Sequence, residues 1–368
     1  MQLSSEDQLR LNVLVAQPLQ AVRIDESRMC VHVLSEKGDA TVQLNPTCKD
    51  EKYVRLVRQF LSTYYLGSPG GYPVYLKRWT RMGQARDDSL EKLLLVGEPE
   101  AVAAVVHAPG LTDELARRAW WSNATAENAR RMLEKESVVK GSMGEELAKF
   151  LIEFLPFEEH QKAIIDSVRL VLQPGLISEE LRAEVWKRGT RKNVYYIGFL
   201  QQTPNDLPVA ADAYPAWNDI CINVQAEVDV GNKIAKLLCQ ILSSAGQAFL
   251  QTTELVLKKP NDQEAVAAIL NAIGEYFDGF ESEVPNWRDI EALRNHAEQY
   301  HQEHQEIQRL SVLNQSLLPQ LKAIFYLSMI NETLVDPIFG KTDAIGSVMR
   351  KKIEPIITPI IENIRVLR

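Results

Sequence analysis

One segment of this 368-residue chain occurs twice, and this duplication restricts the fold more than any other feature. Residues 109–120 read PGLTDELARRAW, and residues 174–186 read PGLISEELRAEVW. In each copy, Pro-Gly-Leu leads to a hydroxyl side chain, Thr112 or Ser178, that is suited to cap a helix. Acidic residues follow and suit the positive end of the helix dipole. Each copy therefore predicts the start of a helix.

The likeness continues beyond the tryptophan that closes each copy. Thr125 aligns with Thr190, and a second helix is expected to follow each threonine. A repeated helix pair is typical of HEAT-like α-solenoids, in which neighbouring repeats share one apolar interior. Solenoids usually contain at least three repeats, and only two copies are legible here. A chance similarity between two helix starts therefore stays open as the alternative.

The N-terminal residues show the pattern of a small sheet. Three short apolar runs, at residues 21–24, 29–34 and 40–44, are separated by turn-like segments. We therefore predict β structure for the first 45 residues, arranged as a three-stranded meander. Apolar residues at helical spacing then predict a helix over residues 52–66.

From about residue 89 onward, the chain is predicted to be helical with short breaks. Residues 220–259 are expected to contain one long amphipathic helix, and Asp262 should cap the next helix. A polar helix that opens at Pro285 carries a heptad-like apolar seam. Residues 320–334 form the most apolar predicted helix, which we expect to be buried.

The C-terminal segment, residues 353–368, has an isoleucine stripe interrupted by two prolines. Pro355 and Pro359 should prevent one continuous helix, so a short final helix is expected with Thr358 as its N-cap. The basic residues before the stripe would suit a membrane surface. Docking onto the protein's own helices is the favoured interpretation.

The predicted fold class is mainly α: a small N-terminal β-meander plus helix (α+β), HEAT-like α-solenoid helical repeats and a C-terminal helical bundle. The expected domains are a small α+β domain over residues 1–86, a helical-repeat domain over residues 87–220 and a C-terminal helical domain over residues 221–368. Within the repeat domain, the related units are expected at about residues 108–172 and 173–220.

Charge and cysteine content restrict the classes of function. The net charge of −8 argues against an electrostatic grip of the whole protein on nucleic acid, but it permits local basic patches. The N-terminus lacks the features of a signal peptide, and there is no apolar run of about 18 residues. We therefore expect a cytoplasmic protein without a membrane span. Its four cysteines form no C-x-x-C pair and are expected to be reduced.

A glycine-rich segment followed by cations is one candidate anion or partner site. In residues 67–71 (GSPGG), backbone N–H groups could converge on an anion, and nearby cations could complete the cradle. The pattern fits neither the P-loop nor the dinucleotide-binding fingerprint. A tight turn that leads into an edge strand is the favoured interpretation. The candidate residues are Gly70, Gly71, Lys77, Arg78 and Arg81.

Each copy of the duplicated segment carries clustered cations near tryptophans, a combination that can hold single-stranded nucleic acid. Acidic neighbours nearly cancel the positive charge, and Trp120 and Trp186 are expected to pack between helices. A solvated charged face is therefore favoured over an RNA-binding groove. The candidate residues for partner or RNA binding are Arg117, Arg118, Arg130, Arg131, Lys187, Arg188, Arg191 and Lys192.

Catalytic and metal-binding patterns are incomplete. His296, His301 and His304 lie close together, and Glu298 with His301 forms one half of a di-iron carboxylate pattern. The second half is missing, so we predict no metal site and no cofactor. The chain also lacks a nucleophile elbow, and we assign no catalytic residue.

Three stretches resemble the DsrS family: residues 66–84 (LGSPGGYPVYLKRWTRMGQ), 108–121 (APGLTDELARRAWW) and 153–157 (EFLPF). The resemblance extends from the N-terminus to about residue 340. DsrS proteins are cytoplasmic and are encoded with the reverse dissimilatory sulfite reductase genes of sulfur-oxidising bacteria. The resemblance implies an accessory role in the oxidation of stored sulfur and brings no catalytic residue.

Sulfur carriers generally use exposed, activated cysteines, and only Cys48, beside Lys49, comes near that description. We therefore predict a non-enzymatic accessory or regulatory protein, a helical scaffold that binds a protein of the sulfur-oxidation machinery. One alternative is an RNA-binding post-transcriptional regulator that uses the basic helix pairs. The other is a small-molecule or redox accessory enzyme that uses the loop at residues 67–71. The oligomeric state stays open.

Overall fold

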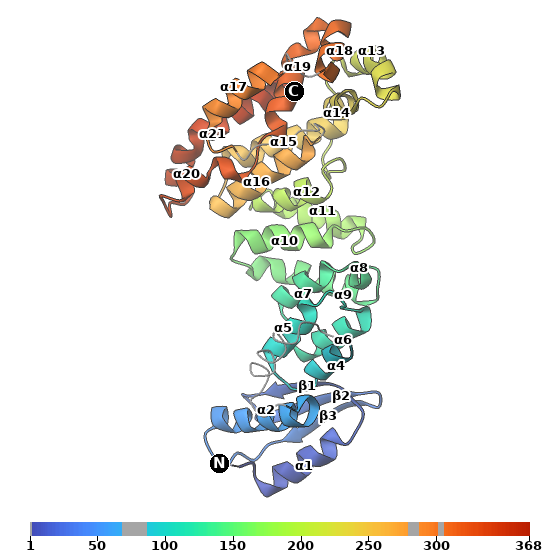
Figure 1. The fold of residues 1–368 in the computed structure, drawn as a ribbon, viewed down its shortest axis with the longest axis vertical. Coiled ribbons are helices and arrows are strands. Elements are labelled where there is room, and N and C mark those ends of the chain that lie inside the picture. The colour runs from blue at the N-terminus through green and yellow to red at the C-terminus, as the bar shows by residue number, and fades with distance from the viewer. Residues whose placement is uncertain (1, 68–86, 279–286, 301–304) are drawn as a thin grey trace. The chain divides into compact units, whose positions relative to one another are not determined.

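The computed structural model describes residues 2–67, 87–278, 287–300 and 305–368. The chain divides into two compact units, Met1–Phe154 and Leu155–Arg368. Each copy of the duplicated segment therefore lies in a different unit, and the three domain ranges expected from the sequence stay a prediction. The described chain is mainly helical with one small N-terminal sheet, which confirms the predicted fold class (Figure 1).

The first unit contains the predicted meander. Its three strands pair antiparallel in the order β1-β2-β3. Val22 on β1 and Val31 and Val33 on β2 are buried beneath the sheet. The strands are β1 (Leu19–Asp25), β2 (Cys30–Ser35) and β3 (Gly38–Gln43).

The prediction of β structure for the first 45 residues was wrong before β1, where the structure has a helix, α1 (Ser5–Val15). Ser4 caps this helix, because its hydroxyl accepts the backbone N–H of Asp7 at 3.1 Å. Leu11 and Leu14 lie on its buried face. A serine cap, an acidic first turn and leucines three residues apart were the sequence signal for this helix.

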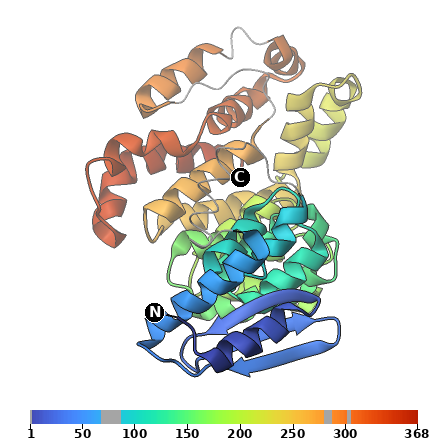
Figure 2. The ribbon, with the colours of Figure 1, turned by 60° about the horizontal axis from the view of Figure 1, so that its bottom comes forward.

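The helix α2 (Asp50–Leu66) confirms the predicted helix and packs with α1 and the sheet around one apolar core (Figures 1 and 2). It ends at Gly67, whose φ of 62° is the left-handed conformation that glycine adopts without strain. The Tyr53 hydroxyl of α2 donates to the buried Asp7 carboxylate at 2.5 Å. The backbone N–H of Asn45 donates to the same carboxylate at 2.8 Å, which ties both helices to the segment that follows β3.

Short helices complete the first unit. The helix α6 packs against β1 and α5, and α7 packs against α9. Asp113, in the first turn of α6, also accepts the backbone N–H groups of Ser142 and Met143, at 2.9 and 3.0 Å, where α9 begins. The helices are α4 (Asp87–Leu93), α5 (Pro99–His107), α6 (Asp113–Ser122), α7 (Ala126–Leu133), α8 (Glu136–Val139) and α9 (Met143–Phe154).

The second unit opens with α10 (Gln161–Val171), α11 (Glu179–Arg188) and α12 (Val194–Gln202). The helices α10 and α12 approach closely at Gly198, where an added Cβ would lie 2.7 Å from the Cβ of Val168. A small residue at this position lets the two backbones come together.

The prediction of one long helix within residues 220–259 was wrong, because three helices occupy this range: α13 (Trp217–Asp229), α14 (Lys233–Leu242) and α15 (Ser244–Lys258). The first break is at Gly231, which has a φ of +90°. The second is at Ser243, whose hydroxyl caps α15. Local capping thus overrides an amphipathic pattern that continues across both breaks.

The remaining helices follow the predicted order. Asp262 caps α16 as expected. The apolar helix predicted over residues 320–334 is present as the shorter, buried helix α19. The predicted seam contributes the buried Leu293, Ala297 and Ile307, which lie on α17 and α18, and its expected start at Pro285 lies outside the described residues. The helices are α16 (Gln263–Tyr276), α17 (Ile290–Tyr300), α18 (Gln305–Leu313), α19 (Leu318–Ser328), α20 (Asp336–Phe339) and α21 (Gly346–Val366).

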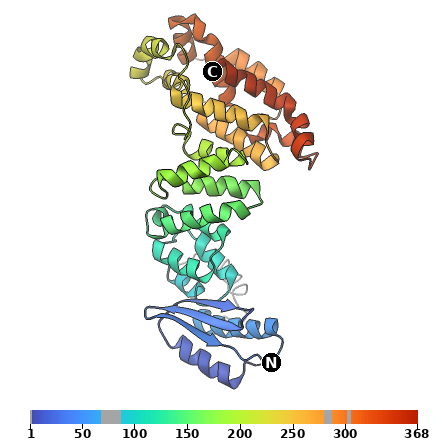
Figure 3. The same ribbon diagram turned by 180° about the vertical axis from the view of Figure 1, so that it is seen from behind.

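The prediction of a broken C-terminal helix was also wrong, because α21 runs without interruption through Pro355 and Pro359 (Figure 3). Thr358 therefore lies inside the helix and caps nothing. Pro355 is exposed, so water can solvate the carbonyl that lacks a partner. The isoleucine stripe packs against α15 and α19, as expected from docking onto the protein's own helices, and this burial offsets the missing hydrogen bonds. Its buried members are Ile353, Ile356, Ile357, Ile360 and Ile364.

Candidate functional site: a basic hollow in the second unit

Several candidate residues lie outside the part of the chain that the structure describes. Gly70, Gly71, Lys77, Arg78 and Arg81 all fall in residues 68–86, so the anion site stays a prediction. His301 and His304 also lie outside the described residues. Among the residues described, no three histidine, cysteine or acidic side chains are grouped to hold a metal ion.

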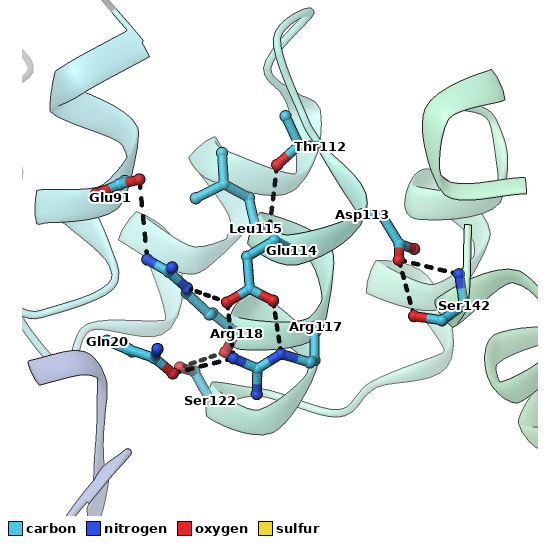
Figure 4. Close-up of polar contacts among 10 residues, drawn as sticks. All are labelled: Gln20, Glu91, Thr112, Asp113, Glu114, Leu115, Arg117, Arg118, Ser122 and Ser142. Atoms are coloured by element: carbon cyan, nitrogen blue, oxygen red, sulfur yellow. Dashed lines mark hydrogen bonds and ion pairs between the residues drawn. The ribbon is translucent and has the colours of Figure 1, made fainter. Parts of the chain in front are cut away.

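In the first copy, the cations on α6 are bound by their own helix (Figure 4). The Glu114 carboxylate accepts hydrogen bonds from Arg117 at 2.7 Å and from Arg118 at 2.8 Å. Arg117 also donates to Gln20 at 3.0 Å, and Arg118 lies 3.9 Å from Glu91. The hydrogen bond from Arg117, with help from Arg118, lowers the pKa of Glu114 to about 2.

The same arrangement recurs on α7. Arg130 and Arg131 pair with the Glu127 carboxylate at 3.0 and 3.1 Å, and Arg131 also pairs with Glu134 at 3.2 Å. Spacings of three or four residues between acid and arginine explain these pairs. All four candidate cations of the first copy are thus engaged within their own helices, as expected of a solvated charged face.

The second copy differs, because its four candidate cations line one hollow of about 480 Å³. The hollow lies where α11 ends and the chain turns into α12. Its walls contain four cationic side chains and one carboxylate. The lining residues are Pro156, Glu184, Lys187, Arg188, Thr190, Arg191, Lys192 and Tyr195.

The cations in this hollow are only partly neutralised. Arg188 pairs with Glu184 at 2.8 Å, and Lys192 donates to the backbone carbonyl of Glu158 at 3.5 Å. No acidic side chain of the described residues lies within ion-pair distance of Lys187 or Arg191. These two exposed cations follow the last acid of α11, and the residues three and four positions before Arg191 are themselves cationic.

Two of the cations in the hollow also interact with titratable side chains of the protein itself. The Asp262 carboxyl, at the start of α16, has a raised pKa mainly because it is buried, and Lys192 partly counteracts that effect. The pKa of the buried Tyr195 hydroxyl is also raised by burial, and Arg188 opposes the shift. Lys192 and Arg188 therefore have neighbours on the protein side, whereas Lys187 and Arg191 face outward.

The tryptophans of the duplicated segment are packing residues. Trp120 contacts Phe150 edge-to-face with 4.7 Å between ring centroids, and Trp186 contacts Tyr196 and Phe199 at 4.5 and 5.0 Å. Both side chains are half-buried, as expected of residues that pack between helices. Sequence reasoning did not single out Phe157, which follows Pro156 of the hollow wall in the chain and is 75% exposed.

Within the described ranges, no helix combines the length and the apolar character needed to cross a membrane. No family model, curated protein or solved structure matches the chain. The basic hollow is therefore interpreted from its own geometry.

Proposed function

We propose that this protein is a non-enzymatic helical scaffold that binds an acidic segment of a protein partner in the basic hollow. The observation that carries the proposal is the pair Lys187 and Arg191, two exposed cations without an acidic partner among the described residues. Unpaired charges of one sign attract a complementary surface and orient it before contact. Carboxylates of a partner would complete the ion pairs that the hollow lacks.

Two features favour an acidic protein segment over RNA. The four cations of the second copy line one hollow, whereas the cations of the first copy are already paired with Glu114 and Glu127. A nucleic acid strand needs a longer basic track and stacking aromatics, but Trp120 and Trp186 are held in packing contacts. The exposed Phe157 offers an apolar contact at the edge of the hollow, which suits a segment that mixes acidic and apolar residues.

The resemblance to DsrS gives this proposal its cellular setting. The partner would be a protein of the machinery that oxidises stored sulfur, and the scaffold would act in the cytoplasm. The RNA-binding regulator stays as the second candidate, because the same four cations of the second copy would also bind phosphates.

Binding of two defined probes by the full chain tests the proposal. The probes are a fluorescent peptide of alternating glutamate and phenylalanine and a single-stranded oligouridine RNA. We expect the variant K187E/R191E to weaken peptide binding roughly tenfold, which corresponds to about 1.4 kcal/mol. The matched variant K149E/K236E makes the same charge change on exposed lysines of α9 and α14 and should leave peptide binding unchanged.

Two outcomes would overturn the proposal. Equal weakening by both double variants would show that net charge, and not the hollow, decides binding. Tighter binding of the RNA than of the peptide, with affinity that falls steeply as salt rises, would favour the regulator.

A further inference from the structure

A helical hairpin brings together two cysteines that lie 18 residues apart in the sequence, Cys221 and Cys239. The helices α13 and α14 pack against each other and are joined by a short turn around Gly231 (yellow in Figures 1 and 3). Asn232 caps α14, because its side-chain oxygen accepts the backbone N–H of Ala235 at 3.0 Å. Two neighbouring helices joined by so short a turn run antiparallel.

Hydrogen bonds between the two ends of the hairpin set its register. The indole N–H of Trp217, in the first turn of α13, donates to the backbone carbonyl of Cys239 on α14 at 3.0 Å. The backbone N–H of Tyr214 donates to the carbonyl of Leu242 at 2.9 Å. Cys221 follows Trp217 by four residues and therefore lies on the same face of α13, one turn further along.

The two thiols meet at the edge of the hairpin's apolar seam. Each cysteine is half-buried, beside the buried Ile220 on α13 and the buried Leu238 on α14. Burial raises the pKa of the Cys239 thiol to about 12, and a hydrogen bond with the Cys221 thiol raises it too. Both thiols are free, and each remains partly accessible to a small reagent.

We propose that Cys221 and Cys239 form a dithiol site that closes reversibly to a disulfide when a low-molecular-weight disulfide is the oxidant. The Cys221 thiolate attacks one sulfur of the reagent, the reagent's S–S bond breaks, and one reagent thiol leaves with a proton from solvent. Cys239 then loses its proton to solvent and attacks the Cys221 sulfur, and the second reagent thiol leaves. Two protein thiols are oxidised, and one reagent disulfide is reduced to two thiols.

The order of attack follows from the surroundings of each sulfur. Burial disfavours the Cys239 thiolate, so we expect Cys221 to attack first and Cys239 to resolve the mixed disulfide. Closure should become faster as pH rises, because the thiolate fraction increases. The product would link α13 covalently to α14. This inference is independent of the basic hollow and of the proposed partner.

Thiol counting on the full chain tests the inference. The folded protein is equilibrated with oxidised glutathione, quenched in acid and unfolded, and its free thiols are titrated. We expect the count to fall from four to two, with a loss of two hydrogens in mass and a cross-linked peptide that contains Cys221 and Cys239. The variant C30S/C48S should still lose two thiols, because it keeps the pair.

Each of the single variants C221S and C239S keeps one thiol of the pair and replaces the other with a hydroxyl group. We expect both to form no internal disulfide and at most a glutathione adduct at the remaining member of the pair. Four free thiols in the treated natural sequence would overturn the inference. A disulfide that involves Cys30 or Cys48 would do the same.

Discussion

Thr112 and Ser178 hold the same position in two helices of the two units. The Thr112 hydroxyl accepts the backbone N–H of Leu115 at 3.2 Å, and the Ser178 hydroxyl accepts that of Leu181 at 3.4 Å. Each cap follows a Pro-Gly-Leu turn and precedes an acidic first turn. The two copies of the duplicated segment thus start their helices by the same local mechanism, although α6 packs on a strand and α11 packs on α12.

Removal of either cap should lower stability. We expect T112A and S178A each to reduce the free energy of unfolding by about 1 kcal/mol, because one backbone N–H of the first turn loses its acceptor. Urea denaturation monitored by circular dichroism measures the change. The variants T112N and S178N keep a capping oxygen and should stay within a few tenths of a kcal/mol of the natural sequence. If the asparagine variants lost as much unfolding free energy as the alanine variants, the hydroxyl groups would stabilise the protein by something other than capping.

Glu114 should make the first unit sensitive to acid. Its folded-state pKa is about 2, below the ordinary 4.5, because Arg117 and Arg118 bind the charged carboxylate. The stabilisation is therefore complete above about pH 4.5 and is lost as pH falls toward about 2. Nearly half of the side chain is exposed, so we expect E114Q to cost no more than about 1 kcal/mol at pH 7.

Unfolding measured at pH 7 and at pH 3 tests this prediction for Glu114. The difference between E114Q and the natural sequence should shrink at the lower pH, because Glu114 of the unfolded chain binds a proton below about pH 4.5 and must release it on folding. E36Q, which removes an exposed charge in the turn between β2 and β3, is the matched control and should change stability equally little at both pH values. A difference that persists or grows at pH 3 would contradict the assigned cause.

Pro355 should weaken α21, although the helix forms. We expect P355A to raise the free energy of unfolding by about 1–2 kcal/mol, because alanine restores a backbone N–H in the helix interior. The gain is smaller than the full helix-propensity difference, since proline also restricts the unfolded chain. Thermal and urea unfolding measure the change. A lower free energy of unfolding for P355A would contradict this prediction and would mean that the proline ring, although exposed, makes a stabilising contact.

Gly198 should tolerate no side chain. Because an added Cβ would lie 2.7 Å from Val168 and 3.0 Å from the backbone nitrogen of Arg169, G198A should force α10 and α12 apart. We expect a loss of roughly 1–3 kcal/mol in the free energy of unfolding, despite the better helix propensity of alanine. A more stable G198A protein would show that the two helices can separate without cost.

Clustering of cations in the sequence indicated the four residues of the second copy that line the hollow. Acidic neighbours were expected to cancel the cations of the first copy, and the structure pairs Arg117 and Arg130 with acids three residues before them. The same spacing leaves Arg191 without a local partner. The hollow itself was not predictable, because its walls combine Pro156, the end of α11 and the start of α12, and only folding brings these together.

The sequence by itself determined the elements whose causes are local. The meander, α2 and the capped starts of α6, α11 and α16 depend on turn residues, apolar periodicity and side chains that bond a backbone group three residues away. Such interactions span one turn of the chain, so a local pattern is enough to predict them.

Tertiary structure decided the features in which distant burial competes with local preference. The helix α21 continues through two prolines because its isoleucines are buried against α15 and α19. Only packing brings Cys221 against Cys239 and groups the cations that follow Ser178 around one hollow. Burial of several side chains together outweighs a local propensity of a few kcal/mol, and that sum depends on partners far along the chain.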